Sequence, residues 1–245
     1  MRLHVHQWGS GPRVVLVHGV LLGGREAWRA QRPLTERWTL LAPDRLGHGK
    51  SPDGVQDFEV DAGLIADQVL DEPAHLVGLS YGAIVAMLAA ATRPEMVRTL
   101  TVVEPPAAGV VRGDEVVDAW DAELRRFLAG PLEDPREVFE AFFPLAGVPL
   151  SIPDPVPETL RRGARALIGM RPPGDAELPL DVLASTDFPM LVVTGDHRPE
   201  YEIIADEIAN RTGARRDVVA GMGHLVPDTG APFNARLEAF LDHGE

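Results

Sequence analysis

Short, unbroken runs of apolar residues alternate along the chain with segments of helical periodicity. Continuous apolar runs are typical of parallel strands that helices cover on both faces. The early segment Leu3-His-Val-His6 instead alternates apolar and polar residues, which suits an antiparallel strand at the edge of a sheet. We predict parallel strands at 13–17, 39–42, 74–77, 99–103, 190–193 and 216–219.

Helical segments separate these strands. Apolar residues fall on one face at 202–211 and at 232–242, and the alanine-rich segment 81–92 ends before Arg93-Pro94. Strands and helices in this order predict an α/β fold with a doubly wound, mostly parallel sheet.

The segment 107–185 interrupts this order. It has no clear strand, and its helical pieces at 114–129 and 135–143 lie among proline-rich turns. We therefore predict an α/β core formed by 1–106 and 186–245, with 107–185 inserted as a helical cap over one end of the sheet.

Charge and composition exclude several classes of function. The 245 residues carry a formal net charge of −14, so nucleic acids and anionic membranes are not expected partners. The absence of cysteine excludes disulfides, thiolate catalysis and cysteine-ligated zinc. The N-terminus has no secretion-signal pattern and the apolar run 83–91 is too short to cross a bilayer, so we expect a soluble, cytoplasmic protein. The oligomeric state is left open.

A candidate nucleophile lies between a predicted strand and a predicted helix. Gly78-Leu-Ser-Tyr-Gly82 has the pattern Gly-x-Ser-x-Gly, in which small residues permit a sharp turn and the serine hydroxyl is lifted clear of the sheet. The alternative is an ordinary turn serine, but the surrounding strand and helix favour a nucleophile at Ser80.

Three further motifs occur in a fixed order around this turn. His18-Gly19-Val20 follows the first parallel strand, Asp44-Arg-Leu-Gly-His-Gly-Lys-Ser51 follows the next, and Gly221-Met-Gly-His224 follows the last. Together the motifs resemble the α/β-hydrolase superfamily over essentially the whole chain. The segments "TVVEPPA" and "GHLVPDTGAPFNARLEAFL" also resemble small, uncharacterised actinobacterial hydrolases of that superfamily.

The resemblance implies a role for each motif. Ser80 would be the nucleophile and His224 the base that takes its proton. Backbone N–H groups of Val20 and Tyr81 would form the oxyanion hole. It implies no cofactor, and no grouping of His, Asp and Glu along the sequence has the spacing of a metal site.

Two carboxylates compete for the role of orienting His224. The superfamily's common pattern places the acid three residues after Gly195, where this chain has Arg198, and Asp196 comes two residues early. Glu104 ends the preceding strand, where some members of the superfamily carry their acid. Neighbouring strands lie about 5 Å apart, a gap that the longer side chain of glutamate helps to close. We favour Glu104 and keep Asp196 as the alternative.

The remaining candidates are residues that would line a substrate pocket. The residues near these motifs are mostly apolar, which suits a small molecule: an apolar carboxylic ester or lactone, cleaved through an acyl-enzyme on Ser80. Cofactor-free perhydrolysis, cleavage of a carbon–carbon bond and non-catalytic ligand binding are the alternatives. The aromatic residues of the insertion could equally form its own core. The candidate lining residues are Leu21, Leu79, Trp120, Phe139, Phe142 and Phe143.

Overall fold

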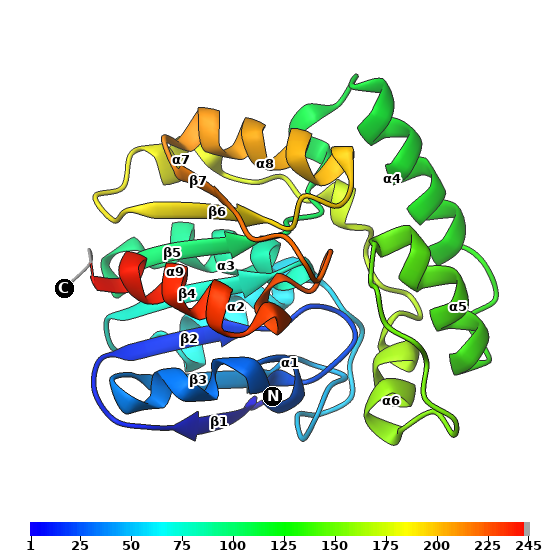
Figure 1. The fold of residues 1–245 in the computed structure, drawn as a ribbon, viewed down its shortest axis with the longest axis horizontal. Helices are drawn as coiled ribbons and strands as arrows, with labels where there is room; N and C mark the ends of the chain where they lie inside the picture. Colours follow the sequence, from blue (N-terminus) through cyan, green and yellow to red (C-terminus); the bar gives the residue numbers. More distant parts are fainter. Residues whose placement is uncertain (243–245) are drawn as a thin grey trace.

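A seven-stranded sheet with the order β1-β3-β2-β4-β5-β6-β7 forms the centre of the molecule (Figure 1). The computed structural model describes residues 1–242, so 243–245 of the expected core lie outside the described residues. β1 pairs antiparallel with β3 at one edge, and the other neighbouring strands are parallel, which confirms the predicted fold class. The strands are β1 (His4–Trp8), β2 (Arg13–Val17), β3 (Thr39–Asp44), β4 (Ala74–Leu79), β5 (Val97–Val103), β6 (Met190–Thr194) and β7 (Arg215–Val218).

Helices connect the strands and cover both faces of the sheet. The α-helices are α1 (Gly24–Ala27), α2 (Phe58–Gln68), α3 (Tyr81–Thr92), α4 (Glu115–Leu128), α5 (Pro135–Ala146), α6 (Glu158–Ala166), α7 (Leu180–Ala184), α8 (Pro199–Thr212) and α9 (Ala231–Leu241). The 3₁₀ helices are η1 (Arg29–Glu36), η2 (Pro94–Met96), η3 (Ala108–Val111), η4 (Pro173–Asp175) and η5 (Val226–Thr229).

The two faces of the sheet bury separate hydrophobic layers. Successive strand residues point to opposite faces, so Val15 and Val17 of β2 pack toward α2, α3 and α8, whereas Val14 and Leu16 pack toward η1 and α9. Burial on both faces is the reason why the parallel strands have continuous apolar sequences.

The insertion lies beyond the carboxyl ends of the strands. In Figure 1 the helices α4, α5 and α6 stand side by side at that end, and we call them the cap helices. Within the described residues, 107–185 contains no strand, as its sequence predicts. The last helix of this segment, α7, was expected to belong to the cap. It packs instead against α3 and α8, in the layer of helices that covers the sheet.

Local sequence signals fix the ends of the cap helices. The carboxylates of Asp114 and Asp134 accept hydrogen bonds from the first backbone N–H groups of α4 and α5. α5 ends at Gly147, which has the left-handed conformation that glycine adopts without strain.

Among the described residues, no helix is both long and apolar enough to cross a bilayer.

Candidate active site

A strained turn presents Ser80 at the carboxyl end of β4. Ser80 has φ 57° and ψ −126° and directly precedes α3. A Cβ atom at Gly78 would lie 2.3 Å from the carbonyl oxygen of Gly82, and one at Gly82 would lie 2.4 Å from the carbonyl oxygens of Val17 and His18. Both glycines are therefore required by close approach of the backbone.

His224 lies between Ser80 and a carboxylate. Its Nε2 is 2.7 Å from the hydroxyl oxygen of Ser80, and its Nδ1 is 3.1 Å from Oε2 of Glu104. An ionised carboxylate only accepts hydrogen bonds, so Nδ1–H donates to Glu104 and the bare Nε2 accepts from the serine hydroxyl. The three side chains come from the ends of β4 and β5 and from the loop after β7. This arrangement can remove the proton of Ser80.

Glu104 is fully buried and held by three N–H groups. The peptide N–H of Gly195 donates to Oε1 at 2.6 Å, and the rings of His197 and His224 contact Oε2 at 2.7 and 3.1 Å. Burial by itself raises the pKa of Glu104, but the hydrogen bonds from His197 and His224 outweigh it and lower the pKa below its ordinary value. Glu104 also has φ 51°, a conformation that is strained for a residue other than glycine.

Asp196 does not occupy this position. Its side chain is exposed at the turn after β6, where φ is 49°, while the next residue, His197, turns inward to Glu104. Arg198 is held by Glu200 and by the carbonyl oxygen of Pro144 in α5. Of the two competing carboxylates, Glu104 is the one that contacts His224.

Two residues near the carboxylate were not predicted as part of the site. The ring of Tyr201 lies 4.9 Å from that of His224 and 5.1 Å from that of His197, measured between centroids. Burial raises the pKa of Tyr201 well above its ordinary value, so its hydroxyl stays neutral. The sequence places His197 beside Asp196 but does not indicate that it contacts an acid on another strand. No sequence signal identifies Tyr201.

The loop after β2 passes along Ser80. A Cβ atom at Gly19 would lie 3.2 Å from that of Ser80. The carbonyl oxygen of Gly19 accepts from Nη2 of Arg45 at 2.8 Å and from Nδ1 of His18 at 2.7 Å. In a trans peptide C=O and N–H point in opposite directions, so the N–H of Val20 points away from Arg45. Tyr81 begins α3, and the first N–H groups of a helix have no partner within it.

Arg45 organises this loop from inside the protein. Its fully buried side chain contacts Oδ2 of Asp61 at 2.5 Å and Oε1 of Gln56 at 2.7 Å. The backbone N–H of Arg45 donates to Nε2 of His18 at 2.9 Å, which requires a bare nitrogen there. Burial and the charge of Arg45 lower the pKa of His18 well below its ordinary value, in agreement with a neutral ring.

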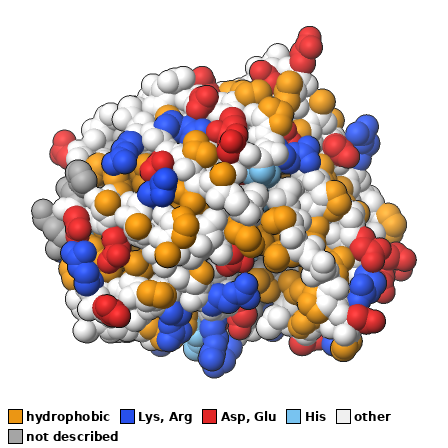
Figure 2. All heavy atoms as spheres, viewed as in Figure 1, with side chains coloured by type: hydrophobic (Ala, Val, Ile, Leu, Met, Phe, Trp, Pro, Cys, Tyr) orange, Lys and Arg blue, Asp and Glu red, His pale blue; other side chains and the backbone are white. Residues whose placement is uncertain are grey.

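A cavity of about 280 Å³ opens beside Ser80 and His224. Glu26, Arg29 and Asp228 add charged groups to its otherwise mainly apolar lining. Figure 2 shows hydrophobic side chains along the boundary between the strand ends and α5 and α6. The predicted lining residues that border this cavity are Leu21, Leu79, Phe142 and Phe143, and Val20, predicted for the oxyanion hole, borders it too. Leu150, Leu160 and Leu225 border it as well and were not predicted.

A second, much smaller cavity of about 20 Å³ also borders Ser80 and His224. Trp120 lines this one, together with Tyr81 and Phe142. Phe139 borders neither cavity next to Ser80, so its assignment to the pocket is wrong. Its fully buried ring instead packs 5.4 Å from that of Phe143, between centroids, in the interior of the cap.

A family model matches most of the chain, and individual relatives match half of it or more. The model of the alpha/beta hydrolase family matches residues 14–237. The lipase LipV of Mycobacterium tuberculosis is 42% identical over 129 residues, which are 50% of this chain and 48% of the lipase. A pimeloyl-acyl-carrier-protein methyl ester esterase of Methylococcus capsulatus is 35% identical over 184 residues, which are 71% of this chain and 66% of the esterase. The chain thus spans about half the length of the first relative and about two thirds of the second.

A solved structure agrees over almost the whole chain. A thermophilic esterase from Thermogutta terrifontis has a TM-score of 0.73 at 24% identity, covering 99% of this chain and 93% of that one, a likeness that concerns the fold alone. The mycobacterial relative confirms the predicted resemblance to actinobacterial hydrolases. The arrangement of strands and the family match lead to one conclusion: the chain belongs to the alpha/beta hydrolase family.

Proposed function

We propose that the protein is a serine hydrolase that cleaves a small, mainly apolar carboxylic ester or lactone through an acyl-enzyme on Ser80. The observation that carries the proposal is the continuous chain of hydrogen bonds from Glu104 through His224 to Ser80, at the wall of an apolar cavity. A base in contact with a serine hydroxyl and oriented by a third group is the signature of an activated nucleophile.

The proposed reaction has two halves. Ser80 Oγ attacks the carbonyl carbon while its proton moves to Nε2 of His224, and Glu104 stabilises the resulting imidazolium. The N–H groups of Val20 and Tyr81 donate to the oxyanion. The ester C–O bond then breaks, and His224 returns the proton to the leaving alkoxide. In the second half a water molecule gives a proton to His224 and attacks the acyl carbon. The bond from that carbon to Oγ of Ser80 then breaks and His224 returns the proton to Oγ, which releases the acid and regenerates Ser80.

The two cavities suggest the shape of the substrate. The larger, about 280 Å³, accommodates an apolar arm, whereas the smaller, about 20 Å³, has room for a group the size of a methyl or a water molecule. We therefore expect a small-molecule ester with one short and one longer side. The named activities of two relatives, a lipase and a methyl ester esterase, support hydrolysis of carboxylic esters.

Covalent labelling tests the nucleophile. A fluorophosphonate probe should lose fluoride and form one phosphonyl adduct at Ser80, detected by intact mass and peptide mapping, and Ser80→Ala should abolish it. Hydrolysis of chromogenic esters with systematically varied acyl and alkoxy lengths then tests the substrate class. A folded wild-type protein that neither labels nor hydrolyses any ester would contradict the proposal and favour ligand binding. Turnover only with peroxide or with a diketone would point to the other chemistries of this fold.

A further inference from the structure

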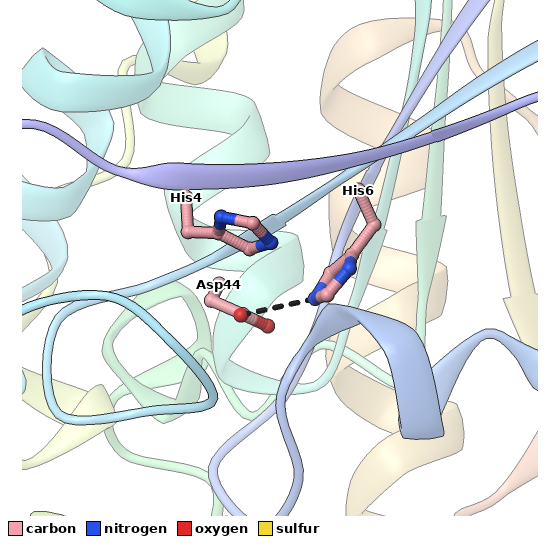
Figure 3. A group of neighbouring side chains, drawn as sticks. All are labelled: His4, His6 and Asp44. Carbon is pink, nitrogen blue, oxygen red and sulfur yellow. Dashed lines mark hydrogen bonds and ion pairs between the residues drawn. The ribbon is translucent and has the colours of Figure 1, made fainter.

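Two histidines of the edge strand face a buried carboxylate. His4 and His6 are two residues apart on β1, so their side chains lie on the same face of the strand. In the antiparallel pairing of β1 with β3, His4 stands opposite Asp44, the last residue of β3. Figure 3 shows both rings and the carboxylate converging on one space, with His6 hydrogen-bonded to Asp44.

The donor atoms of this group are close to the spacing of a metal site. One ligand atom from each of His4, His6 and Asp44 can be chosen so that all lie within 4.8 Å of one another, and Nε2 of His6 is 3.1 Å from Oδ2 of Asp44. Zinc binds nitrogen and oxygen ligands at about 2.0–2.2 Å in a tetrahedron, which requires ligand atoms roughly 3.3 Å apart. Modest rotation of the imidazole rings would therefore bring the three donors to bonding distance.

We propose that His4, His6 and Asp44 bind a divalent transition-metal ion of the zinc class, with water completing its coordination. Two imidazoles and one carboxylate form the mixed nitrogen and oxygen donor set that suits zinc, whereas calcium and magnesium take oxygen donors. Both histidines are partly exposed, which gives the ion a path from solvent.

The surroundings of Asp44 already orient its carboxylate. The backbone N–H of Gly24 donates to Oδ1 at 2.8 Å, and that of Lys50 donates to Oδ2 at 2.8 Å. Both bonds can persist when an ion is bound, because the ion would replace only the contact with His6. Such supporting hydrogen bonds fix the orientation of a metal ligand and strengthen its binding.

The sequence predicted no metal site because the donors are far apart along the chain. His6 and Asp44 are separated by 38 residues and meet only through the pairing of β1 with β3. None of the three residues borders the cavity at Ser80, so this site is independent of the proposed hydrolase activity. A bound ion would connect the edge strand to the rest of the sheet.

Zinc titration of the untagged protein tests the site. Isothermal titration calorimetry on the wild type should show one zinc ion bound, and zinc should raise the midpoint of thermal unfolding. His4→Gln should weaken zinc binding by at least about tenfold. The matched control is Gln7→Ala, because Gln7 is an exposed residue of the same strand that points to the other face. It should bind zinc as the wild type does.

The variants also distinguish zinc binding at this site from zinc binding at other histidines of the protein. His4→Gln is the decisive change, since His6→Gln also removes the hydrogen bond to Asp44 and can disturb the strand. Equal zinc affinity in the wild type and in His4→Gln would overturn the proposal, because the ion would then be bound elsewhere. Absence of zinc binding by the wild type would overturn it as well. Ester hydrolysis by His4→Gln should equal that of the wild type under either result.

Discussion

Glu104 is a buried carboxylate whose negative charge is balanced by hydrogen bonds. An ionised carboxylate is costly to bury unless donors replace its lost water. Here three N–H groups do so, and two of them are imidazole donors on the same oxygen atom. His197 thus supports the proposed base through Glu104, by holding the carboxylate against His224.

Substitution of the two candidate acids distinguishes their roles. Glu104→Gln should lower kcat for ester hydrolysis by about a thousandfold or more, because the amide cannot stabilise the imidazolium of His224. Asp196→Asn should keep most of the activity, since this side chain is exposed and lies outside the contact with His224. Steady-state kinetics on both variants makes the comparison. The reverse result would transfer the role to Asp196.

The lowered pKa of Glu104 predicts how stability depends on pH. Because the pKa is lower in the folded protein than the ordinary value of 4.5, ionised Glu104 stabilises the fold above that value. This contribution is lost as pH falls below 4.5 and through the folded-state pKa. Urea unfolding should show wild type more stable than Glu104→Gln by on the order of 1–3 kcal/mol at neutral pH. The difference should shrink in acid, and a constant difference would exclude a contribution from ionisation.

A site residue can be identified from the sequence only where a reactive residue type occurs at the expected place in a motif or in the order of strands. Ser80 lies in a local turn motif, and His224 lies in the last loop of the expected order, so both can be found without a structure. Glu104 required a comparison between neighbouring strands. His197 and Tyr201 take part through the adjacency of β5 and β6 and the packing of α8, which no local pattern encodes.

At the scale of elements, the loop after β2 depends on the turn after β3. Arg45 accounts for this dependence, because its guanidinium donates to the carbonyl oxygens of both His18 and Gly19. Its charge is balanced by Asp61 of α2. The orientation of the Val20 N–H therefore depends on a buried ion pair that lies outside the cavity.

A double substitution separates this positioning from stability. Arg45→Met alone leaves Asp61 as an uncompensated buried charge and should destabilise the protein by about 3–5 kcal/mol. Arg45→Met combined with Asp61→Leu removes both charges and should recover most of that stability. The double variant should still lose kcat by about tenfold to a hundredfold, with KM little changed, because the Gly19 carbonyl is no longer held. Chemical unfolding and ester kinetics provide the two measurements, and a double variant with wild-type kcat would contradict the role.

The sequence missed one cap helix and shortened another. α6 was not predicted because its buried residues are the small ones Gly163, Ala164 and Ala166, which form no apolar stripe. A Cβ atom at Gly163 would lie 2.1 Å from the carbonyl oxygen of Leu21, so this helix packs directly on the loop beside Ser80. α5 was expected to end at 143, yet it continues through Pro144 to Ala146.

At the scale of the whole molecule, the cap and the core meet at Phe142. This side chain comes from α5, is 6% exposed and borders both the larger and the smaller cavity. The cap therefore determines how the space around Ser80 is divided, while the core supplies the side chains of the proposed reaction.

Enlarging the space at this junction should change substrate preference. Phe142→Ala should join the two cavities and raise the kcat/KM of longer esters relative to short ones by about tenfold. Phe139→Ala is the matched control: it removes the same side chain from the interior of the cap, which costs about 3–5 kcal/mol, and it should leave the ratio unchanged. Both variants are assayed well below their unfolding midpoints. An unchanged ratio in Phe142→Ala would show that Phe142 does not limit the substrate.

The meeting of Glu104 and His197 has an evolutionary consequence. The two residues follow neighbouring strands, β5 and β6, and the side chain of His197 contacts the same oxygen of Glu104 as Nδ1 of His224 does. An ancestor could therefore exchange an acid on one strand for an acid on the other through an intermediate that carried both, without moving the histidine. Selection in such a lineage preserves the position of the carboxylate beside His224 and not its place in the sequence. A sequence alignment would then record a lost acid on one strand, although the protein kept its acid on the other.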